Sequence, residues 1–153
     1  GEVLIEPKGS LTPQAKVPGL DHRKMSKSYG NTLDLFETPA TLGPKVMSMY
    51  TDPLKVRAKD PGHPEGCVVF AMHELYSDFA DRREGECRAG SIGCVACKKE
   101  LLASMEKPFA KFREDRERFA DAVVEEIITA GGCKAREAAE ETMTRVRKAM
   151  NLR

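Results

Sequence analysis

Apolar side chains recur with a helical period over most of the second half of the chain. A long pattern begins at residue 98 and runs to the Gly131-Gly132 pair, with Pro108 expected to break or kink it. The clearest helix is predicted over residues 134–150, where one stripe of small and apolar side chains faces a charged surface. A shorter amphipathic helix is predicted over residues 65–80 from the spacing of Val69, Met72, Tyr76 and Phe79.

The first 52 residues lack this period and are rich in turn-forming and basic residues. Val3-Leu4-Ile5 is predicted to be a strand edge, and residues 8–31 a long loop. Thr38-Pro39 resembles a helix start, but Gly43-Pro44 favours a restart, so the helix proper is expected over residues 44–50. We therefore expect two parts. Residues 1–52 are rich in loops, and residues 53–153 form a mainly α part able to make a small helical bundle.

Composition narrows the functional classes only slightly. The 153 residues carry a net charge of +1, from 25 basic and 24 acidic residues, so a nucleic-acid partner would have to be bound by local patches. No apolar run approaches 18 residues and no secretory leader is recognisable, so we expect no membrane segment and a cytoplasmic location. The chain starts with Gly1 inside a predicted strand, so we expect a piece of a longer protein.

Lysines and serines concentrate in the pentapeptide Lys24-Met25-Ser26-Lys27-Ser28, which we call the KMSKS segment. It lies between the turn formers Pro18-Gly19 and Gly30-Asn31, so we expect an exposed loop. Two ammonium groups with several hydroxyl and amide donors suit a triphosphate and the charge that develops on leaving pyrophosphate. The simpler alternative is a solvated basic loop, because a five-residue pattern is weak alone.

Four of the five cysteines, Cys67, Cys87, Cys94 and Cys97, have the spacing of a ligand set. The two-residue gap between the last two lets both thiolates face one ion around a tight turn. Four thiolates suit either tetrahedral zinc or a 4Fe–4S cluster, and the spacing does not separate the two. The alternative is free buried thiols, which we expect for Cys133 at a predicted helix start. Arg88, Lys98 and Lys99 are expected to offset the thiolate charge.

A series of motifs resembles the C-terminal portion of the bacterial-type tryptophanyl-tRNA synthetases, in the order of that family and over nearly the whole chain. The KMSKS segment has the signature of class I synthetases and follows Pro18-Gly19-Leu20-Asp21. The other matching segments are Lys45-Val46-Met47, Thr51-Asp52-Pro53, residues 61–65, residues 69–70, residues 91–99, residues 134–136 and residues 142–152.

The resemblance implies ATP-dependent joining of tryptophan to its tRNA, with ATP and Mg²⁺, tryptophan and tRNA as partners and a homodimer as the assembly. Residues 1–52 would be the C-terminal edge of a Rossmann-like catalytic domain, with Lys24 and Lys27 catalytic and the whole KMSKS segment (Lys24, Met25, Ser26, Lys27 and Ser28) binding ATP. Residues 53–153 would be a helical anticodon-binding domain. The candidate tRNA contacts there are Arg88, Lys98, Lys99, Lys134, Arg136, Arg145 and Arg147.

Two details qualify the resemblance. A subgroup of the family has a similar four-cysteine pattern and holds a 4Fe–4S cluster near the anticodon-recognising region, which favours iron–sulfur over zinc, although the first cysteine gap here is slightly shorter. The HIGH-type nucleotide motif of the family is not found in the 153 residues, so we do not expect the chain alone to form the adenylate. The alternatives are a non-catalytic RNA-binding module cross-linked by a bound metal and a structural domain cross-linked by zinc without an RNA role.

Overall fold

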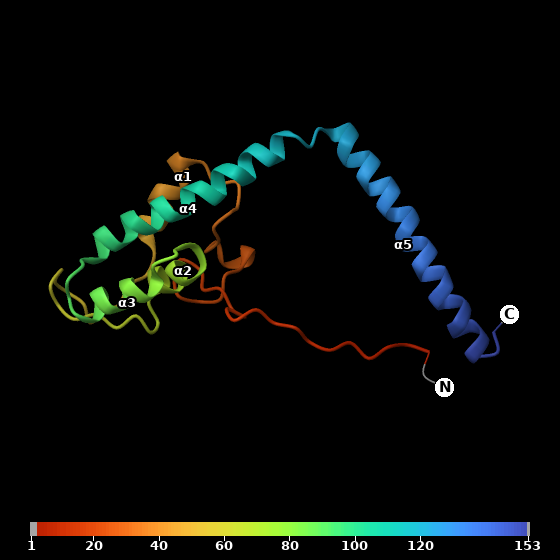
Figure 1. The fold of residues 1–153 in the computed structure, drawn as a ribbon, viewed down its shortest axis with the longest axis horizontal. Coiled ribbons are helices and arrows are strands. Elements are labelled where there is room, and N and C mark those ends of the chain that lie inside the picture. The colour runs from red at the N-terminus through yellow and green to blue at the C-terminus, as the bar shows by residue number, and fades with distance from the viewer. Residues whose placement is uncertain (1–2, 153) are drawn as a thin grey trace. The chain divides into compact units, whose positions relative to one another are not determined.

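The structure is a computed structural model that describes residues 3–152, and helices joined by loops make up the described chain (Figure 1). The helices are η1 (Lys27–Tyr29), α1 (Pro39–Ser48), α2 (Val68–Tyr76), α3 (Ala80–Arg88), α4 (Cys94–Glu117) and α5 (Asp121–Ala149). Between residues 3 and 152 the only strand-like pairing is an isolated antiparallel bridge from Pro18 to Lys24. The predicted mainly α class is therefore confirmed, and the strand predicted for Val3-Leu4-Ile5 is wrong.

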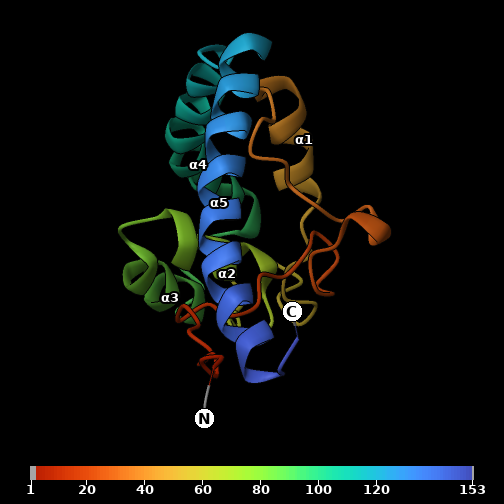
Figure 2. The ribbon, with the colours of Figure 1, turned by 90° about the vertical axis from the view of Figure 1, so that its right-hand side faces the viewer.

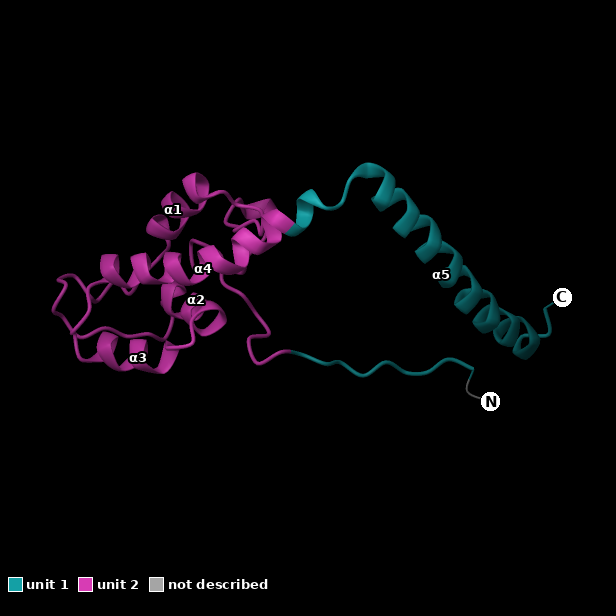
Figure 3. Cartoon of the chain, turned by 45° about the horizontal axis from the view of Figure 1, so that its top comes forward, with its two compact units in different colours: residues 1–11, 115–153 teal, residues 12–114 magenta. Residues whose placement is uncertain are grey.

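The chain divides into two compact units, coloured separately in Figure 3. The larger unit is Thr12–Glu114, and the smaller one combines the first eleven residues with those from Asp115 onward. The predicted division after residue 52 does not coincide with this one. It stays a prediction, because two domains of a longer protein can share a packed interface.

The core of the larger unit lies between α1, α2 and α4, the helices labelled together in Figure 1. Tyr76 adds an edge-on ring contact to Phe109, with 5.7 Å between the ring centres. Because one helix from the loop-rich part packs on two from the helical part, the KMSKS segment is anchored to the same core as the cysteines. The buried apolar residues are Leu42, Val46, Met49, Val68, Val69, Met72, Leu101, Met105 and Phe109.

Helix α1 begins where Thr38-Pro39 predicted, but it runs through Pro44 without the expected restart. At its start, the backbone N–H of Thr38 donates to Oγ1 of Thr41 at 3.1 Å. Pro44 has no N–H to donate to the carbonyl of Ala40. Ala40 is exposed, so water can hydrogen-bond to that carbonyl instead. The buried residues Leu42 and Val46 on either side keep the turn helical, so packing outweighs the missing bond.

Helix α3 was not predicted from the sequence. It lacks an apolar stripe, and ion pairs one turn apart support it instead: Arg82 with Glu86 at 4.0 Å, and Arg88 with Glu84 at 2.7 Å. Helix α2 covers only the centre of the predicted segment 65–80. The apolar periodicity of the sequence did not predict α3, because charged pairs rather than an apolar stripe support this helix.

Helices α4 and α5 also differ from their predicted bounds. Helix α4 begins four residues earlier than predicted and is continuous through Pro108. Helix α5 passes through Gly131-Gly132, which were expected to end a helix (Figure 2). None of its described side chains is buried, so the predicted stripe over residues 134–150 lies outside the core, and Cys133 is exposed rather than packed. No helix among residues 3–152 is long and apolar enough to span a bilayer.

Candidate functional site

A narrow hairpin leads into the KMSKS segment. The backbone N–H of Met25 donates to the carbonyl of Val17 at 3.1 Å, and that of Gly19 donates to the carbonyl of Arg23 at 2.6 Å. The single turn η1 then closes the segment and ends at Gly30, whose φ of 64° is left-handed and favours glycine. The loop predicted around residues 24–28 is thus an ordered turn.

Asn31 ties this turn together from the inside. Its side-chain oxygen accepts the backbone N–H of Ser26 at 2.8 Å, and its amide nitrogen donates to Asp21 at 2.7 Å and to the carbonyl of Lys24 at 3.2 Å. Only 4% of Asn31 is exposed. The hydrogen bond from Asn31 holds the pKa of Asp21 below its usual value. A side chain at Gly19 would not fit, because its Cβ would lie 2.1 Å from Nδ2 of Asn31.

The two lysines of the KMSKS segment remain available to a ligand. Lys24 and Lys27 are exposed, and within residues 3–152 neither side chain makes a hydrogen bond or an ion pair. Met25, in contrast, is half-buried and packs against the core. The arrangement presents two free ammonium groups on a hydrogen-bonded frame, which suits a polyanion such as a nucleotide triphosphate.

The four spaced cysteines come from three helix ends in the larger unit. Cys67 precedes α2, Cys87 lies in the last turn of α3, and Cys94 and Cys97 lie in the first turn of α4. Burial raises the pKa of Cys67, of Cys87 and, to about 12, of Cys97. For Cys97, the negative charges of the other three thiolates raise the pKa further, so the four sulfurs lie within electrostatic reach of one another.

The thiols gather in one region without forming a closed metal site. Among residues 3–152, no three His, Cys, Asp or Glu side chains converge as ligands of one ion. Sγ of Cys97 lies 3.4 Å from Nε2 of His73, a fully buried histidine whose Nδ1 is 2.7 Å from the hydroxyl of Ser77. The donor set has the chemistry of a zinc or iron–sulfur centre, and the predicted ligation itself stays a prediction.

Positive charge near the thiols comes from other residues than the sequence predicted. The buried Lys55 lowers the pKa of Cys87, and the buried Arg83 lowers that of Cys97, although burial is the larger effect on each thiol. Gly62 also borders the region closely, since a Cβ there would lie 2.5 Å from Sγ of Cys87. Sequence reasoning missed Lys55 and Gly62, which only folding brings beside the cysteines, and it missed Arg83 together with the unpredicted helix α3.

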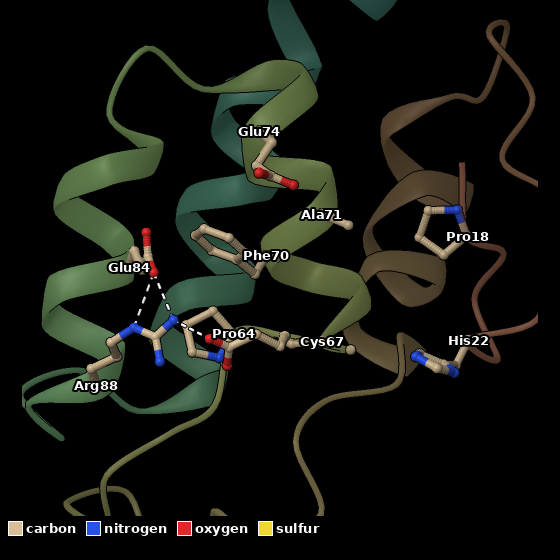
Figure 4. A pocket seen from close by; sticks show the side chains of 11 residues that line it. Pro18, His22, Pro64, Cys67, Phe70, Ala71, Glu74, Glu84 and Arg88 are labelled. Carbon is tan, nitrogen blue, oxygen red and sulfur yellow. Dashed lines mark hydrogen bonds and ion pairs between the residues drawn. The ribbon is translucent and has the colours of Figure 1, made fainter. Parts of the chain in front are cut away.

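Figure 4 shows a pocket of about 350 Å³ that borders both regions. The hairpin that leads into the KMSKS segment contributes Pro18 and His22 to it, and the start of α2 contributes Cys67. On its other side, Arg88 is bound to Glu84 and Glu65, as the dashed lines mark. The hydrogen bond to Glu65 raises the pKa of Arg88, so its charge is fixed and already paired.

The candidate tRNA contacts have different surroundings. Lys98 is buried, and its ammonium group donates to the carbonyl of Met47 at 2.8 Å, which is a structural role. Lys99 is exposed on α4, and Lys134 and Arg136 are exposed on α5. Whether any of them contacts RNA stays a prediction.

Comparison with known proteins shows the family to which the chain belongs. The family model described as tRNA synthetases class I (W and Y) matches residues 2–110. The chain therefore belongs to the class I tRNA synthetase family for tryptophan and tyrosine.

Within that family, the chain matches curated tryptophan–tRNA ligases. The chain is 45% identical to the enzyme of Aquifex aeolicus and 42% identical to that of Thermotoga maritima, in each case over 99% of its own length. It spans 40% and 48% of the length of those two relatives. Tryptophanyl-tRNA synthetase from Campylobacter jejuni, solved with ADP and tryptophan, is 30% identical, with a TM-score of 0.72 over 90% of this chain and 44% of that one.

Proposed function

We propose that the chain supplies the phosphate-binding loop and the helical tRNA-binding part of a tryptophan–tRNA ligase. In that reaction the carboxylate of tryptophan attacks the α-phosphate of ATP and pyrophosphate leaves; the 3′ hydroxyl end of the tRNA then accepts the aminoacyl group and AMP leaves. The observation that supports it best is the pair of exposed, unpaired lysines on the frame built by Asn31. Relatives 42–45% identical over 99% of the chain are ligases of this type.

Lys24 and Lys27 would contact the β- and γ-phosphates of ATP bound with Mg²⁺. Negative charge on those phosphates increases as the bond to the α-phosphate breaks, so the ammonium groups would stabilise the transition state more than the bound substrate. Ser26 and Ser28 would hold the turn and donate hydrogen bonds, and Met25 would keep the segment attached to the core.

The test uses the complete gene product, because the matched relatives are about twice as long as this chain. Replacing Lys27 by Ala should slow ATP–pyrophosphate exchange about a hundredfold, because one charge-stabilising donor is lost. Tryptophan binding should stay unchanged. The matched control is Lys107→Ala, which removes an exposed lysine of α4. An unchanged exchange rate for Lys27→Ala would show that this lysine does not serve the reaction.

The remaining partners follow from the same proposal. The helical part would bind the tRNA anticodon, with Lys99, Lys134 and Arg136 among the exposed candidates. The complete protein would act in the cytoplasm as a homodimer. Retention of tryptophan-specific tRNA that weakens steeply with salt would support the RNA role.

We further propose that Cys67, Cys87, Cys94 and Cys97 hold a metal centre, a 4Fe–4S cluster in preference to zinc. The mutual electrostatic reach of the four sulfurs supports it, and so do the buried cations Lys55 and Arg83 beside them. Such a centre would supply a structural cross-link between α2, α3 and α4. The residues of the chain would supply the thiolates and the charge that balances them.

Purification without oxygen tests the centre through its visible spectrum and through iron, sulfide and zinc analysis. Near-equal iron and sulfide would identify a cluster, and one zinc per chain would identify the alternative. Cys94→Ser should release the metal and make residues 67–99 more sensitive to protease. Cys133→Ser, which changes an exposed cysteine of α5, is the matched control. Unaltered metal content and protease resistance in Cys94→Ser would contradict the four-ligand site.

A further inference from the structure

Arg83 is the most deeply buried charged side chain in the described structure, with 1% of its area exposed. It lies on α3 and forms ion pairs with Glu86, at 2.5 Å, and with Glu100 on α4. Its Nε is the one buried side-chain nitrogen or oxygen within residues 3–152 that has no hydrogen-bond partner. A native structure rarely leaves such a donor unsatisfied, so this N–H is available to a water or to another group beside α3.

The position of Arg83 relates it to the cysteines. It lies one turn before Cys87 on the same face of α3, and its partner Glu100 lies one turn after Cys97 on α4. A chain of ring contacts makes the same link. The guanidinium carbon is 5.5 Å from the centre of the Phe79 ring, and that ring is 5.7 Å from His73. His73 in turn lies 3.4 Å from Sγ of Cys97.

Thiolates buried beside these helices would be stabilised by two kinds of group: cations that balance their negative charge and N–H groups that donate to sulfur. Four thiolates around one metal keep an excess of negative charge, which burial makes unfavourable unless a cation and hydrogen bonds compensate it. Arg83 carries both a buried positive charge and an unused N–H. The charges of Glu86 and Glu100 already offset part of that cation, but their side chains are 35% and 46% exposed, so water screens them.

We propose that Arg83 is the positioning residue of the cysteine centre, balancing the thiolate charge and donating its Nε–H to a sulfur. The proposal rests on the metal centre proposed above and adds a residue that is not a ligand. The competing explanation is that Arg83 serves only the packing of α3 on α4 through its two glutamates. The two explanations differ in whether loss of the guanidinium weakens metal retention specifically.

The test compares Arg83→Met and Arg83→Lys with a matched control, Arg82→Met. Arg82 precedes Arg83 on α3, its side chain is 60% exposed, and it approaches the same Glu86 and Glu100, at 4.0 and 3.9 Å. Each complete protein is prepared without oxygen, and the rate of metal loss to excess chelator is measured. Arg83→Met should lose metal about 10- to 100-fold faster than wild type. Arg82→Met should match wild type.

A second measurement separates a role at the centre from a role in folding. If the wild type holds an iron–sulfur cluster, Arg83→Met should lower its reduction potential, because the reduced, more negative state loses a buried cation that balances its charge. Arg83→Lys keeps the charge without the guanidinium fork, so it should retain metal better than Arg83→Met but worse than wild type. It also keeps the test decisive should Arg83→Met fail to fold, as judged by helical content and thermal unfolding.

The outcomes distinguish the two proposals. Metal loss at the wild-type rate from a folded Arg83→Met or Arg83→Lys protein would overturn the role of Arg83 and leave the centre intact. A wild-type protein that retains neither iron nor zinc would overturn the centre and the role of Arg83 together. Equal acceleration in Arg82→Met would show a general effect of charge on α3 and would also overturn the assignment.

Discussion

Asn31 shapes the KMSKS segment although it lies outside the five-residue motif. Its carboxamide makes hydrogen bonds to Asp21, Lys24 and Ser26, and its backbone oxygen accepts the N–H of Leu20. A side chain held by this many bonds limits the conformations of the loop before any ligand arrives. Preorganisation of this kind spares ATP the free-energy cost of ordering the lysines.

Replacing Asn31 by Ala should therefore impair the loop while the lysines remain. The half-buried N–H of Ser26 would lose its acceptor, so we expect the free energy of unfolding to fall by about 1–3 kcal/mol. ATP–pyrophosphate exchange in the complete gene product should slow, and protease should cut faster within residues 18–31. Thr12→Ala, at an exposed residue outside this network, is the control. Equal protease resistance in Asn31→Ala and wild type would refute the framing role.

The residue scale also shows what the sequence could and could not predict about the candidate site. Lys24 and Lys27 were predictable, because their motif is contiguous along the chain and its lysines are exposed. Lys55 was not, because it approaches the cysteines only when separate segments pack together, and Arg83 was not, because α3 itself was not predicted. Lys98 shows the opposite error: a lysine next to a cysteine motif looked available, yet it is buried and its ammonium group donates to the carbonyl of Met47.

At the scale of the element, helices with an apolar stripe were predicted and the others were not. Helix α2 followed from the spacing of Val69, Met72 and Tyr76, whereas α3 has ion pairs in place of a stripe. Proline and glycine do not interrupt these helices where the sequence predicted that they would. Pro44 and Pro108 lie inside helices whose neighbouring turns are buried, so packing exceeds the cost of one lost hydrogen bond.

The buried and exposed faces of α4 can be compared by substituting one phenylalanine on each. Phe109 is fully buried in the core and contacts Tyr76, whereas Phe112, one turn later, is 41% exposed. Phe109→Ala should lower the free energy of unfolding by about 3–5 kcal/mol, because it leaves a cavity among α1, α2 and α4. Phe112→Ala should cost less than about 1 kcal/mol, since its ring is already largely hydrated. Urea unfolding of both variants measures the difference, and equal losses would contradict the assigned core.

At the scale of the whole molecule, the apolar contacts are unevenly shared between the two compact units. All nine buried apolar residues of the described chain belong to Thr12–Glu114. Helix α5 contributes none, and its Ile127 and Ile128 are 53% and 68% exposed. Isolated helices of ordinary composition are marginal in water, so α5 should be less stable than the helices that share the core.

Amide hydrogen exchange on the 153-residue chain measures this difference helix by helix. Amides of α2 and of the buried part of α4 should open only with global unfolding, whereas those of α5 should exchange much faster through local opening. Ile127→Asp should leave exchange in α2 unchanged, while Phe109→Ala should accelerate it, because only Phe109 belongs to the core. Equal protection of α5 and α4 at low protein concentration would contradict this expectation. Protection of α5 that appears only as concentration rises would instead show that its apolar side chains become covered by a second copy of the chain.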